Sequence, residues 1–188
     1  MKYYLWVLGC AMNYSDAERI GAVLNGLGYS KTEHEDKADL LITIACSVRQ
    51  KAIDRIYGRK KVWAKMKTAR PDFKLILTGC VLEKDKPRMA AIFDAIFEIS
   101  DLSKLPEMLG VALSVKGKNV LGKPGDYLAI MPTYESNFRA YVPIMTGCNN
   151  FCSYCAVPYT RGREKSRPQK EILAETKSLI QKLSLIHI

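Results

Sequence analysis

The sequence lacks the long apolar run of a membrane-spanning helix. No stretch approaches the roughly 20 consecutive apolar residues that cross a bilayer. The opening residues, Met-Lys-Tyr-Tyr-Leu-Trp-Val-Leu-Gly, also lack the form of a secretion signal and fit a strand better. We therefore predict a cytoplasmic chain without a membrane partner, and its 48% hydrophobic content is sufficient for a packed core.

Acidic residues are also scarce. The chain has 19 Asp and Glu against 29 Lys and Arg, which gives a formal charge of +10. An excess of this size favours a polyanionic partner. On charge alone, RNA, DNA and an anionic membrane surface are all admissible.

Only two histidines are present, whereas there are six cysteines. Because the cytosol keeps thiols reduced, metal binding or redox chemistry is a better interpretation of these cysteines than a disulfide framework. They fall into a widely spaced triad and a tightly spaced triad. The first contains Cys10, Cys46 and Cys80, and the second contains Cys148, Cys152 and Cys155.

Each cysteine of the first triad follows a predicted strand, formed by residues 2–8, 39–44 and 73–78. A predicted helix follows each strand. The first opens at the capping box Ser15-Asp-Ala-Glu18 and ends near Gly28, the second covers residues 48–69, and the third runs from Pro87 to Phe93. This alternation predicts an α/β fold with an open parallel sheet.

In such a sheet the three cysteines lie along one edge, where open α/β sheets bind ligands. Three thiolates at that edge could hold three irons of a cubane cluster and leave the fourth iron free for an exogenous ligand. The alternative is that these cysteines are ordinary small core residues. That alternative is weaker for three equivalent positions than for any one of them.

The second triad has the spacing CxxxCxxC, a short loop that can wrap three thiolates around one face of a cluster. Structural zinc is the competing interpretation, but it normally takes four protein ligands. Neither His34 nor His187 has the spacing of a fourth ligand to this loop. The sequence therefore favours a cluster that keeps one iron open.

The CxxxCxxC motif, with aromatic Tyr154 just before its last cysteine, resembles the signature of the radical S-adenosylmethionine superfamily. The resemblance implies that the open iron chelates the cofactor and that Tyr154 lies in the cofactor-binding part of the loop. It also implies that residues 140–146 form the first strand of a barrel and residues 171–183 its crossover helix. No separate catalytic side chain is assigned.

Both triads, with the segments 8–13, 15–19, 46–52, 78–80 and 147–168, are similar to the methylthiotransferase family and most like its MiaB branch. The resemblance implies two 4Fe–4S clusters: Cys148, Cys152 and Cys155 hold the one that cleaves the cofactor, and Cys10, Cys46 and Cys80 hold an auxiliary one for sulfur insertion. One departure is Ile44-Ala45, where the family usually has Asn-Thr.

The implied reaction adds a methylthio group to C2 of an isopentenylated adenosine beside the tRNA anticodon. The implied partners are the anticodon stem-loop, an electron donor and a sulfur source. Related branches modify a threonylcarbamoyl adenosine or an aspartate of a ribosomal protein. Outside the family, the alternative is a non-catalytic RNA-binding module held together by zinc or by an electron-transfer cluster.

Two groups of basic residues fit an RNA partner, although a solvated helix face explains the first equally well. The first group lies between Arg49 and Arg70. The second follows the CxxxCxxC loop and contains Arg161, Arg163, Lys165, Arg167 and Lys170.

We predict a methylthiotransferase-type domain over residues 1–109, a Gly- and Pro-containing linker over 110–137 and the start of a radical S-adenosylmethionine barrel over 138–182. The barrel is incomplete, so the fragment is expected to be inactive although its parent is an enzyme. Residues 183–188, Leu-Ser-Leu-Ile-His-Ile, match a translated sequencing adaptor and are expected to be an artefact.

Overall fold

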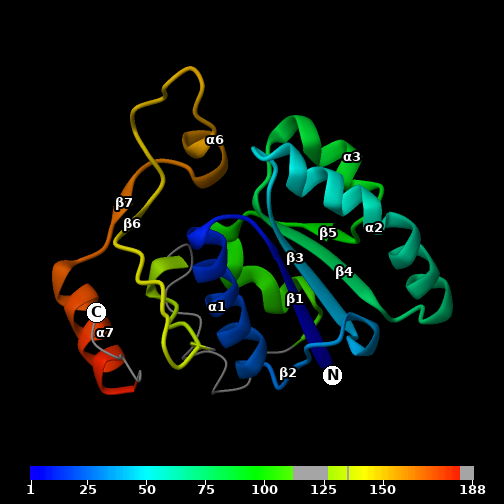
Figure 1. Ribbon diagram of the computed structural model, residues 1–188, viewed down its shortest axis with the longest axis horizontal. Coiled ribbons are helices and arrows are strands. Elements are labelled where there is room, and N and C mark those ends of the chain that lie inside the picture. Colours follow the sequence, from blue (N-terminus) through cyan, green and yellow to red (C-terminus); the bar gives the residue numbers. More distant parts are fainter. Residues whose placement is uncertain (112–126, 135, 183–188) are drawn as a thin grey trace.

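The computed structural model describes residues 1–111, 127–134 and 136–182. Its N-terminal part is built on one parallel sheet with the strand order β2-β1-β3-β4-β5 (Figure 1). The strands are β1 (Lys2–Leu8), β2 (Ser30–Lys31), β3 (Leu40–Cys46), β4 (Lys74–Cys80) and β5 (Ala95–Ile96). This is the doubly wound order of flavodoxin-like sheets, in which the chain reverses direction across the sheet between β1 and β3.

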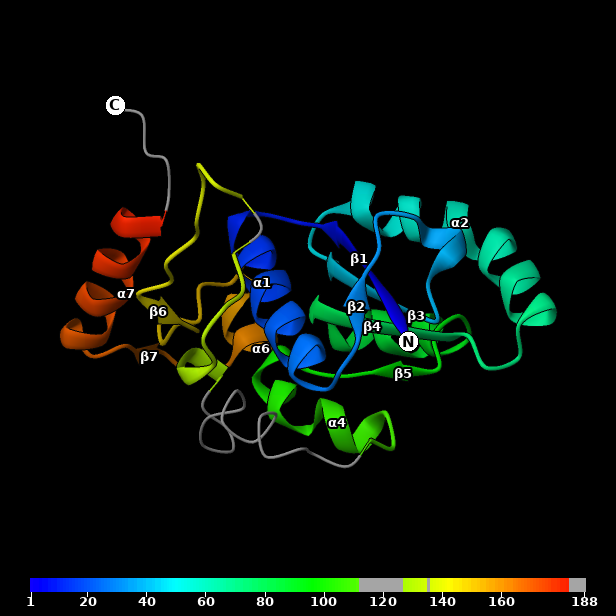
Figure 2. The ribbon, with the colours of Figure 1, turned by 90° about the horizontal axis from the view of Figure 1, so that it is seen from below.

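Helices cover both faces of the sheet (Figure 2). One face packs against α2 (Gln50–Ala69) and α3 (Lys86–Ala90), and the other against α1 (Ala11–Gly26), α4 (Leu105–Met108) and the 3-10 helix η3 (Ile99–Lys104). Shorter 3-10 helices are η1 (Glu35–Lys37), η2 (Glu83–Asp85) and η4 (Tyr127–Ala129). Within the described ranges, no helix is both long and apolar enough to cross a bilayer.

Strand β3 is the middle strand of the sheet, and all seven of its residues are buried. Its side chains alternate between the two faces, as the period of two in a strand requires. Leu41 and Ala45 join the core under α2, whereas Ile42 and Ile44 join the core under α1. The unusual pair Ile44-Ala45 is thus accommodated as buried apolar packing within the sheet.

The three predicted cysteine-bearing strands and the long second helix are confirmed, but the predicted start of the first helix is wrong. Helix α1 begins at Ala11, and Cys10 is its N-cap. The side-chain carbonyl of Asn13 accepts a hydrogen bond from the Cys10 amide at 3.0 Å, which supplies the cap that the sequence had placed at Ser15. Ser15 and Asp16 are instead buried inside the helix.

The C-terminal part differs from the expected barrel start. Of the predicted strand at residues 140–146, only β6 (Met145–Thr146) forms, and it pairs antiparallel with β7 (Lys165–Ser166). A parallel partner would have to follow a crossover helix, and the described residues end with that helix, α7 (Gln169–Lys182). The CxxxCxxC loop and the short helix α6 (Val157–Arg161) lie between β6 and β7.

Most of the predicted linker lies outside the described residues, as do residues 183–188. The described residues of η4 pack on the N-terminal core: Tyr127 and Leu128 are buried there with Ile130. The proposed domain boundaries remain predictions.

Candidate iron–sulfur sites

The cysteines of the first triad lie at the carboxyl ends of three adjacent strands. In the β1–β3 pair Leu8 is opposite Ala45, and in the β3–β4 pair Cys46 is directly opposite Cys80. Cys10 follows two residues after Leu8. The prediction that these cysteines share one sheet edge is therefore confirmed, and the edge coincides with the chain reversal between β1 and β3.

Cys46 and Cys80 interact directly. The side-chain hydrogen bond from Cys46 lowers the pKa of the Cys80 thiol to about 6, and the charge of Arg161 acts in the same direction against the opposing effect of burial. As the donor in that bond, Cys46 has a raised pKa, and its burial adds to the shift. Cys80 is thus the member of this pair that is prepared as a thiolate, the form that binds metal.

The sheet edge also contains an unpaired donor. Asn13 is fully buried, and its side-chain Nδ2 has no hydrogen-bond partner among the described residues. A Cβ placed on Gly79 would lie 3.1 Å from that nitrogen. A buried N–H left unsatisfied beside Cys10 and Cys80 fits a site that takes a sulfur-rich group, because cluster sulfurs accept hydrogen bonds.

Gly79 allows β3 and β4 to approach each other at this edge. Its φ is +106°, and a Cβ there would lie 2.3 Å from the carbonyl oxygen of Ala45. We expect Gly79→Ala to destabilise the chain by about 2 kcal/mol or more, since it combines an unfavourable φ with a backbone clash.

The matched control for that substitution is Gly58→Ala in the interior of α2, where a Cβ meets nothing within 4 Å. This control should stabilise the helix by about 0.5–1 kcal/mol. Urea unfolding of both variants measures the difference. A Gly79→Ala chain as stable as the parent would show that the close approach is not required.

The second triad lies in a loop fixed at its base by the β6–β7 ladder. The Cys148 amide donates to the Gly162 carbonyl at 3.1 Å, and the Cys155 amide donates to the Cys152 carbonyl at 2.9 Å. Cys152 is exposed, whereas Cys148 and Cys155 are half-buried. The side chain of Tyr154 is 88% exposed, so the structure places it on the outer surface of the loop.

Within the part of the chain that the structure describes, no three His, Cys, Asp or Glu side chains converge closely enough to hold a metal ion. The fold therefore brings one triad to a common sheet edge and the other to a common loop, but it does not draw either into a closed ligand set. The roles of the six cysteines as cluster ligands, and of Tyr154 toward the cofactor, stay predictions.

The basic residues between Arg49 and Arg70 divide into two classes. Arg59 pairs with Glu35, Lys67 pairs with Asp94 at 2.6 Å, and Arg70 donates to the carbonyl of Ala38 at 2.9 Å. These three side chains connect α2 and its C-terminal end to neighbouring segments of the N-terminal part. The exposed members are Arg49, Lys51, Arg55, Lys60, Lys61 and Lys65.

A cleft of about 460 Å³ adjoins the sheet edge at the end of β1. Gly9 and Tyr14 line it on one side, and Arg49, Lys51 and Arg55 line it on the other. It therefore connects the exposed basic residues of α2 with the surroundings of Cys10.

Sequence reasoning missed a buried polar network between the two triads. Asp16 and Arg161 form an ion pair across 145 positions of the sequence, and Tyr127 donates to the same carboxylate. The sequence signal was indirect: both residues lie in segments that resemble the methylthiotransferase family, and Arg161 also belongs to the basic group after the loop.

Comparison with protein families agrees with this two-part arrangement. Residues 2–99 match the model described as "Uncharacterized protein family UPF0004", and residues 142–188 match the Radical SAM superfamily. Matches to that superfamily imply the use of an iron–sulfur cluster and S-adenosylmethionine.

Three similar curated proteins share the name tRNA-2-methylthio-N(6)-dimethylallyladenosine synthase. The protein from Dictyoglomus thermophilum is 36% identical over 95% of this chain and 42% of its own length. The protein from Thermoanaerobacter sp. is 36% identical over 97% of this chain and 40% of its own length, and the one from Geotalea uraniireducens is 38% identical over 94% and 42%.

The chain thus spans about two fifths of the length of these relatives. The predicted family resemblance is confirmed over both parts of the sequence. With its parallel sheet, its edge of cysteines and its CxxxCxxC loop, the chain belongs to the UPF0004 family and continues into a Radical SAM region.

Proposed function

We propose that the chain is the front part of a tRNA methylthiotransferase that modifies C2 of an isopentenylated adenosine beside the anticodon. The observation that carries the proposal is the presence, in one chain, of three cysteines on one sheet edge and of a CxxxCxxC loop followed by a helix, α6, that contacts β4 of that sheet. The names of the similar proteins support the same reaction.

The two triads would hold separate 4Fe–4S clusters. Cys148, Cys152 and Cys155 would leave one iron for S-adenosylmethionine, and Tyr154 would lie against that cofactor. When bound, these groups supply a radical and a sulfur atom, both of which are needed because an aromatic C–H bond has no leaving group. The protein's own contribution is to fix the two sites relative to each other and to lower the pKa of the Cys80 thiol to about 6.

The substrate partner in this proposal is the tRNA anticodon stem-loop. Its phosphates would meet the exposed basic residues of α2, which border the cleft beside Cys10. The electron donor and the sulfur source are separate partners of unidentified chemistry. A tRNA substrate supports a cytoplasmic location, and so does the use of six cysteines for metal binding instead of disulfides.

The test is nucleoside analysis of tRNA from a strain that lacks its own methylthiotransferase and is complemented with the full-length protein containing this chain. We expect the 2-methylthio form of the isopentenylated adenosine to return, and the 188-residue chain alone to restore none.

A methylthio group on threonylcarbamoyl adenosine, or on a ribosomal-protein aspartate, would reassign the substrate within the family. Full loading with clusters but no methylthio product on any of these substrates would favour a non-catalytic RNA-binding module.

A further inference from the structure

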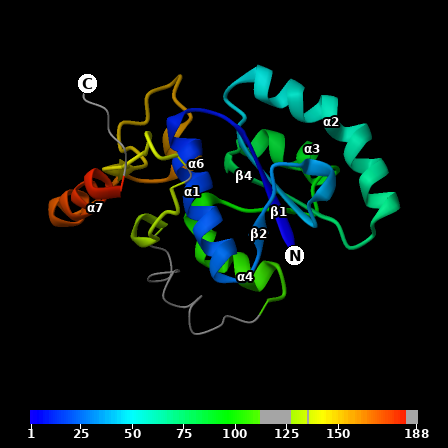
Figure 3. The ribbon, with the colours of Figure 1, turned by 60° about the horizontal axis from the view of Figure 1, so that its bottom comes forward.

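We propose that Arg161 is a positioning residue that joins the two cluster sites and donates a hydrogen bond to a ligand of the auxiliary cluster. The inference deepens the proposed function and rests on it for the role of Cys80. Arg161 is the last residue of α6, directly after the CxxxCxxC loop, whereas Cys80 ends β4. Figure 3 shows α6 beside α1 and next to the end of β4.

The guanidinium of Arg161 contacts two partners, Cys80 and Asp16. Its Nε lies 3.1 Å from Sγ of Cys80, and its two terminal nitrogens bind the two carboxylate oxygens of Asp16, one of them at 2.9 Å. The side chain of Arg161 is 4% exposed and that of Asp16 is not exposed at all. This is a bidentate, charge-assisted contact that fixes the plane of the guanidinium and with it the direction of the Nε–H bond.

Asp16 is itself held in place by the N-terminal core. The hydroxyl of Tyr127 donates to its Oδ1. Burial, reinforced by the charge of Asp16, raises the pKa of Tyr127 well above its usual value, so the phenol remains a neutral donor. The guanidinium of Arg19 lies 5.4 Å from the centre of the Tyr127 ring. The anchor therefore involves three segments, α1, η4 and α6.

Burial is the largest single effect on the pKa of Arg161 and lowers it, but the charge of Asp16, its hydrogen bond to the guanidinium and the charges of Cys80 and Tyr127 together raise that pKa above its usual range. Buried ion pairs contribute little net stability, whereas removing one partner leaves an uncompensated buried charge. A pair of this kind is well suited to fixing one relative arrangement of the segments that carry it.

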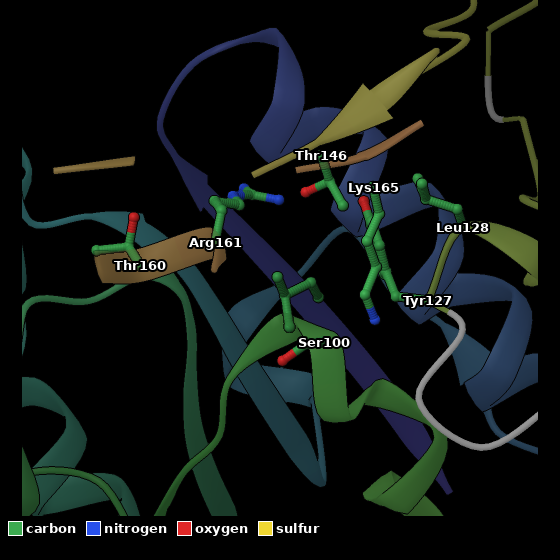
Figure 4. A pocket seen from close by; sticks show the side chains of 8 residues that line it. Ser100, Tyr127, Leu128, Thr146, Thr160, Arg161 and Lys165 are labelled. Atoms are coloured by element: carbon green, nitrogen blue, oxygen red, sulfur yellow. The ribbon is translucent and has the colours of Figure 1, made fainter. Parts of the chain in front are cut away.

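The space around this joint is too small for a ligand. Ser100, Tyr127, Thr146, Thr160 and Lys165 surround a cavity of about 40 Å³ next to Arg161 (Figure 4). A cavity of this volume admits about one water molecule. Arg161 thus borders a narrow cavity between the two parts of the chain, and its contact with Cys80 is directed at the auxiliary site.

A hydrogen bond to a ligand sulfur stabilises the more negative, reduced state of a cluster and so raises its reduction potential. The test uses the reconstituted chain with Cys148, Cys152 and Cys155 replaced by Ala, so that only the auxiliary cluster titrates. In that background we expect Arg161→Gln to shift the midpoint potential to a more negative value. The matched control, Arg163→Gln in the same segment, removes an equal charge that lies over the Phe151 ring and should cause no shift.

A second readout needs no cluster. In the unloaded chain, Arg161→Gln leaves the buried Asp16 carboxylate without a cationic partner, which costs roughly 3 kcal/mol. Hydrogen exchange of the amides in α6 and of Cys148 should accelerate by about 100-fold, the equivalent of that cost. Arg161→Lys keeps the positive charge but cannot bind both carboxylate oxygens of Asp16 and Sγ of Cys80 at once. Hydrogen exchange should therefore accelerate less than in Arg161→Gln, and the midpoint potential should still become more negative.

The inference is overturned if both Arg161 variants exchange at the parental rate, or if both load a cluster with an unchanged potential. Failure of the triple-Ala background to load any cluster would instead count against Cys10, Cys46 and Cys80 as ligands, and thus against the proposed function. In that case the exchange measurement still decides whether Arg161 joins the two parts of the chain.

Discussion

Replacing Cys152 by Ala in the full-length protein is expected to reduce the cleavage of S-adenosylmethionine to background, measured as 5′-deoxyadenosine. Cys152 is the central cysteine of the CxxxCxxC loop and is exposed, so its replacement removes a proposed cluster ligand without opening a cavity in the core. With two of three ligands left, the cluster that receives the cofactor is not retained.

The control for this substitution is Ser153→Ala, an exposed neighbour in the same loop that carries no thiol. It should form 5′-deoxyadenosine at the parental rate. Parental cleavage by the Cys152→Ala protein would refute the assignment of the loop as the cofactor-cleaving site.

The second large effect is expected from Cys46→Ala, which should spare cofactor cleavage and stop methylthio transfer. Cys46 ends β3 on the sheet edge, directly opposite Cys80. Its loss would remove one ligand of the auxiliary cluster and leave the CxxxCxxC loop intact. The measurement pairs 5′-deoxyadenosine formation with the yield of methylthiolated tRNA.

Val48→Ala is the matched control for Cys46→Ala, because Val48 follows the same strand and its side chain is 53% exposed. It should support both reactions. A normal product yield from the Cys46→Ala protein would contradict a sulfur-inserting role for the first triad.

Much of the N-terminal fold was predictable from the sequence because it depends on local patterns. The apolar runs before Cys10, Cys46 and Cys80 are long enough to specify buried strands, and parallel pairing then puts their ends on one edge. Strands β2 and β5 were missed because each has only two residues. The start of α1 was misplaced because the Asn13 side chain supplies the cap.

Contacts between distant segments were beyond sequence reasoning. The antiparallel pairing of β6 with β7 brings together the two ends of the loop that contains the second triad. The Asp16–Arg161 pair joins residues that no local periodicity relates, and it is recognisable only once α6 is placed against α1. The cysteines themselves were predictable as site candidates because their spacing is chemically distinctive.

The central claim is that the two triads hold two separate clusters, and the iron and sulfide content of the anaerobically reconstituted chain tests it most directly. The account predicts about eight irons for the parent chain and about four for each variant that has one triad replaced by Ala. About four irons in the parent, lost entirely when either triad is replaced, would contradict it.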